Sequence, residues 1–260
     1  MTAAVPRLRM FAGPNGSGKS TIKSVLRPEL LGVHINPDEI ERDIRRFGFL
    51  DLAVYGVETT REEILSFFSA STLLARADLL DEAQALSFTD QKLSFFAVLV
   101  NAYFAAVAAD FLRQKLLAQK VTFTFETVMS SRDKVDLLCK AQQLGYRTYL
   151  YYVATEDPII NISRVKARVR RGGHSVPEDK IVSRYSASLD LLLDAIRCSN
   201  RAYLFDNSNH QQIFVAEITD GRLLEMKTAA MPGWFKWAVW DKIAPSASTP
   251  TPPPGSPASI

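Results

Sequence analysis

The sequence has few of the residues and segments that mark specialised classes of protein. Its only cysteines, Cys139 and Cys198, lack the short spacing of metal ligands, so we expect reduced core thiols in a cytoplasmic protein. The net charge is +3 over 260 residues, which is too small to indicate nucleic-acid binding. The first residues, MTAAVPRLRM, contain no apolar segment, so no signal peptide is expected.

Long apolar segments are also scarce, and the exception is residues 93–109. This stretch carries no charge, but it contains Ser94, Asn101 and Tyr103 and only reaches the lower limit of length for a membrane span. A buried helix of a globular protein is the better interpretation. We therefore expect no membrane segment in this chain.

What is present begins with GPNGSGKST, directly after the apolar run RLRMFA. The stretch fits G-x-x-x-x-G-K-[ST], in which glycines let backbone N–H groups point at phosphate oxygens. Lys19 is placed to reach the β- and γ-phosphates of ATP, and the Ser20 hydroxyl to bind Mg²⁺. A predicted strand at 8–12 and a predicted helix at 19–26 supply the expected context. The predicted nucleotide-binding residues of this P-loop are Gly13, Pro14, Asn15, Gly16, Ser17, Gly18, Lys19, Ser20 and Thr21.

Two further absences indicate which class of nucleotide-binding protein this chain belongs to. The strings N-K-x-D and D-x-x-G, which GTP switches require, do not occur in the chain. The apolar run VTFTFE ends in the single acid Glu126, whereas mechanical ATPases normally carry adjacent acids there. Together these absences favour a small phosphotransferase.

Strand-like and helix-like segments alternate over most of the chain. This alternation predicts an α/β fold, a P-loop kinase-like open parallel sheet with helices on both faces. Predicted strands lie at 8–12, 31–35, 121–127, 148–154 and 202–205, and predicted helices between them include 132–144 and 178–197.

Two regions depart from this alternation within a predicted domain of residues 1–243. Residues 47–119 are expected to be a largely helical insertion after the second strand, with helices at 59–77 and 89–119 and a cap at Thr89-Asp90. IFVAEITDGRLLEM predicts a C-terminal hairpin that turns at Asp220-Gly221. Residues 244–260 contain six prolines and are predicted to be a disordered tail.

The stretch HINPDEI offers a catalytic base. Asp38 follows the second predicted strand, and ligands bind at the carboxyl ends of strands in open α/β sheets. A carboxylate there can accept the proton of a substrate hydroxyl that attacks the γ-phosphate. The alternative is structural, because Asn36 can cap a helix that starts at Pro37, and Asp38 would then only complement the helix dipole.

The stretch FETVMSS offers substrate contacts. Glu126 and Thr127 also lie at the carboxyl end of a predicted strand, where a carboxylate can hold sugar hydroxyls. Their alternative role is to cap the helix that begins near Ser131, which Ser130 or Ser131 can also do.

The stretch RVKARVRRGGHSVPEDKIVSRY is crowded with arginines around Gly172-Gly173. Arginines that close over a transferring phosphoryl group stabilise its negative charge, and the glycines would let such a lid move. A solvated basic helix face and an RNA contact are the alternatives, and one Arg-Gly-Gly is weak support for RNA. The arginines are Arg164, Arg168, Arg170, Arg171 and Arg184.

In this order, GPNGSGKST, NPDEI, FETVMSS, RVRRGGHSVPEDKIVSRY and DNS resemble the zeta toxin family of P-loop kinases. The similarity is greatest to the compact branch with a GGHxVP lid, and it spans residues 7–41 and 108–208. The resemblance implies that Lys19 and Ser20 hold ATP and Mg²⁺ and that Asp38 is the general base. It further implies γ-phosphate contacts by Arg168, Arg171 and Arg184, a nucleotide contact by Asn207, and substrate contacts by Glu126, Thr127 and Asn36.

The resemblance also implies a substrate and a partner. Zeta toxins phosphorylate the 3′-hydroxyl of the amino sugar in UDP-N-acetylglucosamine, and an antitoxin protein is a further expectation. This chain departs from the better-known toxins in its lid and its insertion, which leaves the acceptor open. Two other classes also stay open. A nucleic-acid end kinase would need a basic groove, and a non-catalytic interaction protein would use the P-loop as a nucleotide sensor.

Overall fold

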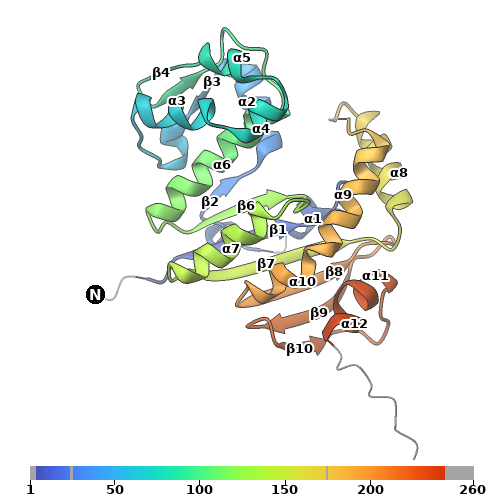
Figure 1. The fold of residues 1–260 in the computed structure, drawn as a ribbon. Coiled ribbons are helices and arrows are strands. Elements are labelled where there is room, and N and C mark those ends of the chain that lie inside the picture. Colours follow the sequence, from blue (N-terminus) through green and yellow to red (C-terminus); the bar gives the residue numbers. More distant parts are fainter. Residues whose placement is uncertain (1–3, 24–25, 174, 244–260) are drawn as a thin grey trace, which may run out of the picture.

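A seven-stranded sheet forms the centre of the computed structural model, which describes residues 4–23, 26–173 and 175–243 (Figure 1). The predicted tail at 244–260 and His174 of the lid lie outside the described residues. The first five strands in the spatial order β2-β6-β1-β7-β8 are parallel, and β9 and β10 are antiparallel additions. The bounds are β1 Arg7–Ala12, β2 Val33–Ile35, β6 Phe123–Thr127, β7 Arg147–Ala154, β8 Arg201–Asp206, β9 Ile213–Thr219 and β10 Leu223–Met226.

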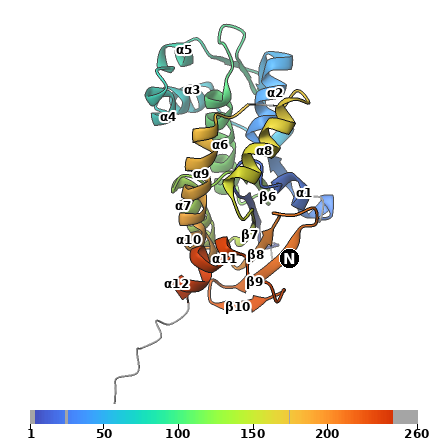
Figure 2. The same cartoon turned by 90° about the vertical axis from the view of Figure 1, so that its right-hand side faces the viewer.

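Helices cover the two faces of this sheet unequally. In Figure 2, α1 lies on the opposite side of the sheet from α7 and α10. Side chains of β1 alternate accordingly, since Met10 joins the large core and Phe11 packs with Ile22 of α1 in a small one. The helices are α1 Lys19–Lys23, α2 Pro37–Phe47, α3 Arg61–Ser69, α4 Thr72–Arg76, α5 Leu80–Gln84, α6 Ala102–Ala118, α7 Asp133–Gln143, α8 Pro158–Val169, α9 Glu178–Asp190, α10 Leu192–Arg197, α11 Gly233–Phe235 and α12 Asp241–Ile243.

The predicted α/β alternation is present in the structure. Each strand predicted from the sequence overlaps an observed parallel strand, and α7 matches the helix predicted at 132–144. The helix predicted at 178–197 is interrupted at Leu191, which separates α9 from α10. The predicted turn at Asp220-Gly221 joins β9 to β10, with both residues in the left-handed region at φ 49° and 65°.

The insertion differs from the prediction in both halves. The helix predicted at 59–77 is divided into α3 and α4, since Ser71 caps a new helix, and the second half is not one helix over 89–119. Strands β3 Phe49–Asp51, β4 Ser87–Thr89 and β5 Lys92–Ser94 form a small antiparallel sheet in the order β3-β5-β4. Asp90 and Gln91 turn the β4–β5 hairpin with φ 52° and 58°. The helix begins only at Ala102, where the Asn101 side chain accepts a hydrogen bond from the Tyr103 N–H at 2.9 Å.

The uncharged run at 93–109 is therefore divided among the end of β5, a loop and the first half of α6. Most α6 residues from this run, including Phe104 and Ala109, are buried as predicted, whereas Ala102 and Tyr103 at the start of the helix are exposed. Phe96 and Leu99 of the loop are exposed, at 78% and 86%. Within the described parts of the chain, no helix combines the length and the hydropathy that a bilayer span requires.

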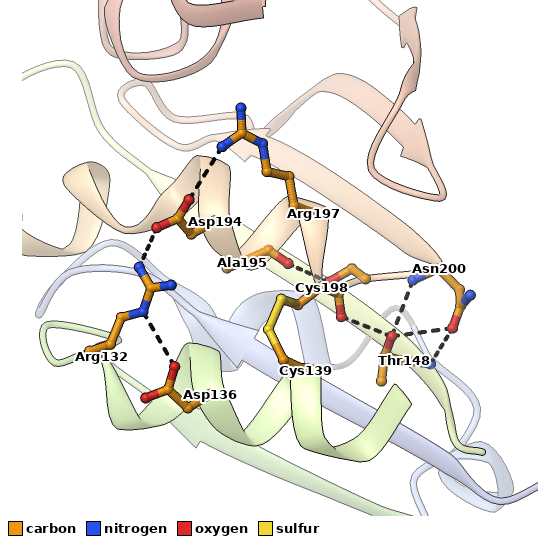
Figure 3. Close-up of a disulfide and its surroundings, with 10 residues drawn as sticks. Arg132, Asp136, Cys139, Thr148, Asp194, Ala195, Arg197, Cys198 and Asn200 are labelled. Carbon is orange, nitrogen blue, oxygen red and sulfur yellow. Dashed lines mark hydrogen bonds and ion pairs between the residues drawn. A yellow bond between two sulfur atoms is a disulfide. The ribbon is translucent and has the colours of Figure 1, made fainter. Parts of the chain in front are cut away.

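The prediction of reduced thiols is wrong, because Cys139 of α7 and Cys198 after α10 form a disulfide (Figure 3). This pairing could not be predicted from the sequence, since 59 positions separate the two residues and α7 and α10 meet only in the folded chain. The same two helices are joined by an ion pair between Arg132 and Asp194. The disulfide closes a loop that contains β7, α8, α9 and α10.

Loss of this disulfide is expected to lower the free energy of unfolding by about 4 kcal/mol, because a closed loop of 59 residues restricts the unfolded chain. The melting temperature of Cys198→Ser should fall by roughly 10 °C. Denaturant unfolding of wild type with and without reductant measures the same difference. The Cys139→Ser/Cys198→Ser double variant is the control, and its stability should not respond to reductant. Equal stability of oxidised and reduced wild type would contradict this expectation.

Candidate active site

The P-loop connects the carboxyl end of β1 to the start of α1. Gly13 adopts φ +143°, and a Cβ there would lie 2.1 Å from the Val153 carbonyl oxygen of β7, so no other residue fits. The Lys19 ammonium lies back across the loop and donates to the Gly13 and Pro14 carbonyl oxygens at 2.7 and 3.0 Å. The positive charge of Lys19 thus lies beside the P-loop backbone. The phosphates of a bound nucleotide would replace the two carbonyl oxygens as its partners.

Asn207 fixes the P-loop from the end of β8. Its Nδ2 donates to the Ser17 carbonyl oxygen at 2.7 Å, and its backbone N–H donates to Ala154 O at 2.8 Å. The preceding residue, Asp206, is buried and accepts a hydrogen bond from Trp234 Nε1 of α11 at 2.8 Å. Asn207 therefore lies against the backbone of the P-loop. The resemblance to zeta toxins predicts a nucleotide contact for this residue.

Ser20 fits the predicted role in Mg²⁺ binding. Its side chain is exposed at the start of α1, and it makes no hydrogen bond within the described residues. A free hydroxyl next to the phosphate position suits Mg²⁺, which prefers oxygen ligands and takes most of them from water and substrate phosphates. The described residues hold no cluster of three or more His, Cys, Asp or Glu side chains that would form a separate metal site.

Glu126 is a buried carboxylate at the end of β6, with 9% of its side chain exposed. It lies 3.6 Å from His34 Nε2 of β2 and 4.0 Å from Lys23 Nζ of α1. Burial raises the pKa of Glu126 and lowers the pKa of His34. Neither ring nitrogen of His34 has a hydrogen-bond partner within the described residues, and sequence reasoning passed over this histidine although it lies two residues before Asn36.

Asp38 and its neighbours combine structural and chemical roles. The Asn36 side chain caps α2 by accepting from the Asp38 N–H at 2.9 Å, as its alternative role predicted. Thr127 Oγ1 similarly accepts from the Met129 N–H at 3.0 Å. The Asp38 carboxylate itself is exposed in the first turn of α2 and accepts no hydrogen bond from the described residues, so it is free to meet a substrate.

The electrostatics of Lys19 bring these parts together. Burial lowers the pKa of Lys19 to about 8, while Glu126 and Asp38 oppose this shift and Arg168 adds to it. Groups from β6, α2 and α8 thus act on one ammonium. Glu126, Asp38 and Arg168 therefore all interact electrostatically with Lys19.

A pKa of about 8 for Lys19 makes ATP binding sensitive to pH. The phosphates of ATP favour the protonated ammonium and raise the pKa of Lys19 on binding. Above about pH 8, ATP binding therefore requires that Lys19 take up a proton. We expect ATP affinity to be constant below that pH and to fall by up to about tenfold per unit above it. Calorimetric titrations at several pH values measure this slope. Lys23→Gln should keep the slope and Lys19→Gln should lose it, whereas a slope in Lys19→Gln would assign it to another group.

The lid arginines line a cavity of about 480 Å³ along α8. Its lining consists of Arg164, Ala167, Arg168, Arg171, Gly172 and Gly173. The sequence placed Arg164 in the lid segment but did not predict a γ-phosphate contact for it. Its Nη1 is buried without a hydrogen-bond partner in the described part of the chain. Arg164 and Arg168 lie four positions apart on α8, and Arg171 follows just after the end of this helix. This spacing was the signal that could have grouped Arg164 with the other two arginines.

Arg184 is not placed with these arginines. It is an exposed residue of α9 and is absent from the lining of the cavity. The structure therefore assembles two of the three predicted γ-phosphate arginines, adds Arg164, and leaves Arg184 outside.

Comparison with known sequences gives little information. No model of a known protein family matches the chain. An uncharacterized protein of Haemophilus influenzae is 32% identical over 69 residues, which are 26% of this chain and 49% of that protein. The aligned part thus spans about half the length of this curated relative.

Comparison with solved structures shows the fold. Crystal structures of the AvrRxo1-ORF1:AvrRxo1-ORF2 complex with sulfate ions and with ATP match 95% of this chain and 66% of theirs, with a TM-score of 0.53 and 14% identity. The PezAT chromosomal toxin-antitoxin system of Streptococcus pneumoniae matches 82% of this chain and 73% of its own, with a TM-score of 0.47 and 14% identity. The similarity to the AvrRxo1 structures shows that the chain shares their α/β fold, with the mostly parallel sheet and the C-terminal antiparallel hairpin that the sequence predicted.

Proposed function

We propose that this chain is an ATP-dependent phosphotransferase that phosphorylates a hydroxyl of a small molecule. The observation that carries the proposal is that β1, which leads into the P-loop and Lys19, pairs with β6 so that Phe11 lies opposite Glu126. Asp38 and Arg168 also act electrostatically on Lys19. The site combines a phosphate-binding lysine and an arginine with two carboxylates. A nucleotide sensor would need the cations alone, whereas transfer to a hydroxyl also needs a base.

In the proposed mechanism, each part of the site has one task. The P-loop amides and Lys19 hold the β- and γ-phosphates, and Ser20 would hold Mg²⁺, which neutralises phosphate charge when bound. The Asp38 carboxylate takes the proton from the acceptor hydroxyl. The hydroxyl oxygen forms a bond to the γ-phosphorus while the bond from this phosphorus to the β–γ bridging oxygen breaks. Arg164, Arg168 and Arg171 stabilise the charge on the transferred group, and ADP leaves with the bridging oxygen.

The proposed acceptor is a nucleotide sugar such as UDP-N-acetylglucosamine. Support comes from the motif resemblance and from two carboxylates, Glu126 and Asp38, which act electrostatically on Lys19, and of which Glu126 is desolvated. Such carboxylates accept hydrogen bonds from sugar hydroxyls. They repel a phosphate next to the reacting hydroxyl, which argues against a nucleic-acid end kinase.

A protein partner is a second part of the proposal. The AvrRxo1-ORF1 structures contain a second protein, ORF2, and we carry this property over as an antitoxin-like partner. The exposed side chains of Phe96 and Leu99 on the insertion give such a partner apolar surface to cover.

The experiment incubates the purified chain with ATP, Mg²⁺ and UDP-N-acetylglucosamine and follows ADP and the phosphorylated sugar by mass spectrometry. A metabolite extract and single-stranded RNA with a free 5′-hydroxyl are parallel acceptors, and reactions without ATP are the control. We expect phosphate on the sugar. Phosphate on the RNA would instead establish the end kinase. ATP binding without turnover in any mixture would overturn the transferase proposal in favour of a nucleotide sensor.

A further inference from the structure

Asn161, in the first turns of α8, connects the lid helix to the P-loop. The residue is fully buried, and its Nδ2 donates to the Asn15 carbonyl oxygen at 2.6 Å. Its Oδ1 accepts a hydrogen bond from Thr155 Oγ1. Gly16 packs against the same position, since a Cβ on Gly16 would lie 2.6 Å from the Asn161 carbonyl oxygen. The α8 backbone and side chain at this residue therefore both contact the P-loop.

The hydrogen bond to Asn15 fixes the direction of one peptide group. In a trans peptide, the C=O of one residue and the N–H of the next point in opposite directions. The Asn15 carbonyl points out toward Asn161, so the Gly16 N–H points the other way, into the loop. Gly16 has φ +77°, a conformation in which a glycine peptide can turn easily once its partner is lost. Asn207 holds the Ser17 carbonyl in the same manner at 2.7 Å.

The position of Asn161 on α8 links this peptide to the arginines. Asn161, Arg164 and Arg168 follow at i, i+3 and i+7, so they share one face of the helix. The α9 residue Tyr185 donates from its hydroxyl to the Thr155 carbonyl oxygen at 2.7 Å and extends the network to the second lid helix. The base of the lid and the phosphate loop are thus held by one buried set of hydrogen bonds.

We infer that Asn161 is a positioning residue that orients the Gly16 N–H toward the ATP phosphates and sets the arginine face of α8 above them. This inference rests on the proposed function, because it assumes that the P-loop binds ATP. Asn161 acts through the Asn15–Gly16 peptide and does not itself contact the nucleotide.

The test compares two isosteric variants. Asn161→Asp keeps the acceptor for Thr155 but loses the donor to Asn15. Its ATP affinity is expected to fall by roughly 10–100-fold, because the Gly16 N–H loses its hydrogen bond to the charged phosphates. Asn200→Asp is the matched control, since Asn200 also accepts through Oδ1 (from Thr148 N, 2.9 Å) and donates through Nδ2 (to Asp220, 3.2 Å) away from the site (Figure 3). Asn200→Asp should melt at a lower temperature and bind ATP like wild type.

Calorimetric titration with Mg·ATP and thermal melting are the two readouts. Equal ATP affinity of wild type and Asn161→Asp would overturn the inference alone, whereas a wild type that binds no ATP would overturn the proposed function and the inference with it. Should Asn161→Asp not fold, Asn161→Ala carries the same expectation and the same contrary result. Faster amide exchange of residues 13–18 in the variant, with unchanged exchange elsewhere in the sheet, would further support the positioning role.

Discussion

Replacement of Asp38 by asparagine is expected to lower acceptor phosphorylation by on the order of 10²–10⁴-fold and to leave ATP affinity nearly unchanged. Asparagine keeps the size of the side chain and can still accept a hydrogen bond, but it has almost no basicity. The Asp38 carboxylate is exposed in the first turn of α2 and acts electrostatically on Lys19. Loss of the base should therefore appear in the chemical step alone.

The competing role for Asp38 predicts a different result. If Asp38 only complements the dipole of α2, Asp38→Asn should cost about 0.3–1 kcal/mol of stability and leave turnover intact. Glu39→Gln is the matched control, because it removes a negative charge from the same helical turn. Melting temperature, ATP binding and product formation are measured on both variants. A mildly destabilised and fully active Asp38→Asn enzyme would show that another residue is the catalytic base.

Replacement of Arg168 by alanine is expected to lower kcat on the order of 10³-fold, with a small effect on the ATP affinity. Arg168 lines the arginine cavity of α8 and acts on Lys19, so its charge lies near the position of the transferred phosphate. Arg170→Ala is the matched control, because Arg170 belongs to the same helix end but lies outside the lining of that cavity. Single-turnover kinetics separates the chemical step from binding.

Two outcomes would contradict the role of the lid. An Arg168→Ala enzyme that loses RNA binding while sugar phosphorylation is unchanged would favour the RNA interpretation of the basic segment. Equal losses in Arg168→Ala and Arg170→Ala would indicate a general charge effect. Arg184→Ala belongs in the same series, because the resemblance gives Arg184 the same role although the structure leaves it on the exposed side of α9.

The elements that carry the site could be predicted because their signals are local. The strand before GPNGSGKST, the Asn36-Pro37 start of α2 and the Asp220-Gly221 turn depend on a few neighbouring residues. Strand ends in an open α/β sheet meet at one edge, so Glu126 and Asp38 could be placed near Lys19 before their geometry was known.

The remaining features depend on contacts between distant segments. The turn and β5 were interpreted as the start of a helix because Thr89-Asp90 resembles a helix cap, whereas the pairing of Phe88 with Leu93 forms only across the turn. Cys139 and Cys198 are joined by the packing of α7 on α10, which no spacing encodes. Asn161 passed unnoticed for the same reason, since its partner Asn15 is 146 positions away.

The hydrogen bond from Trp234 to Asp206 connects the last helices to the strand end that carries Asn207, and thus to the P-loop. Gly233 also donates to Glu156 at 2.8 Å, one residue before the Asp157 cap of α8. A truncation after β10, by a nonsense mutation or a protease, would remove support from both Asn207 and the base of the lid. Shortened versions of this chain should thus lose ATP binding together with part of the core, although every proposed nucleotide-binding residue would still be present.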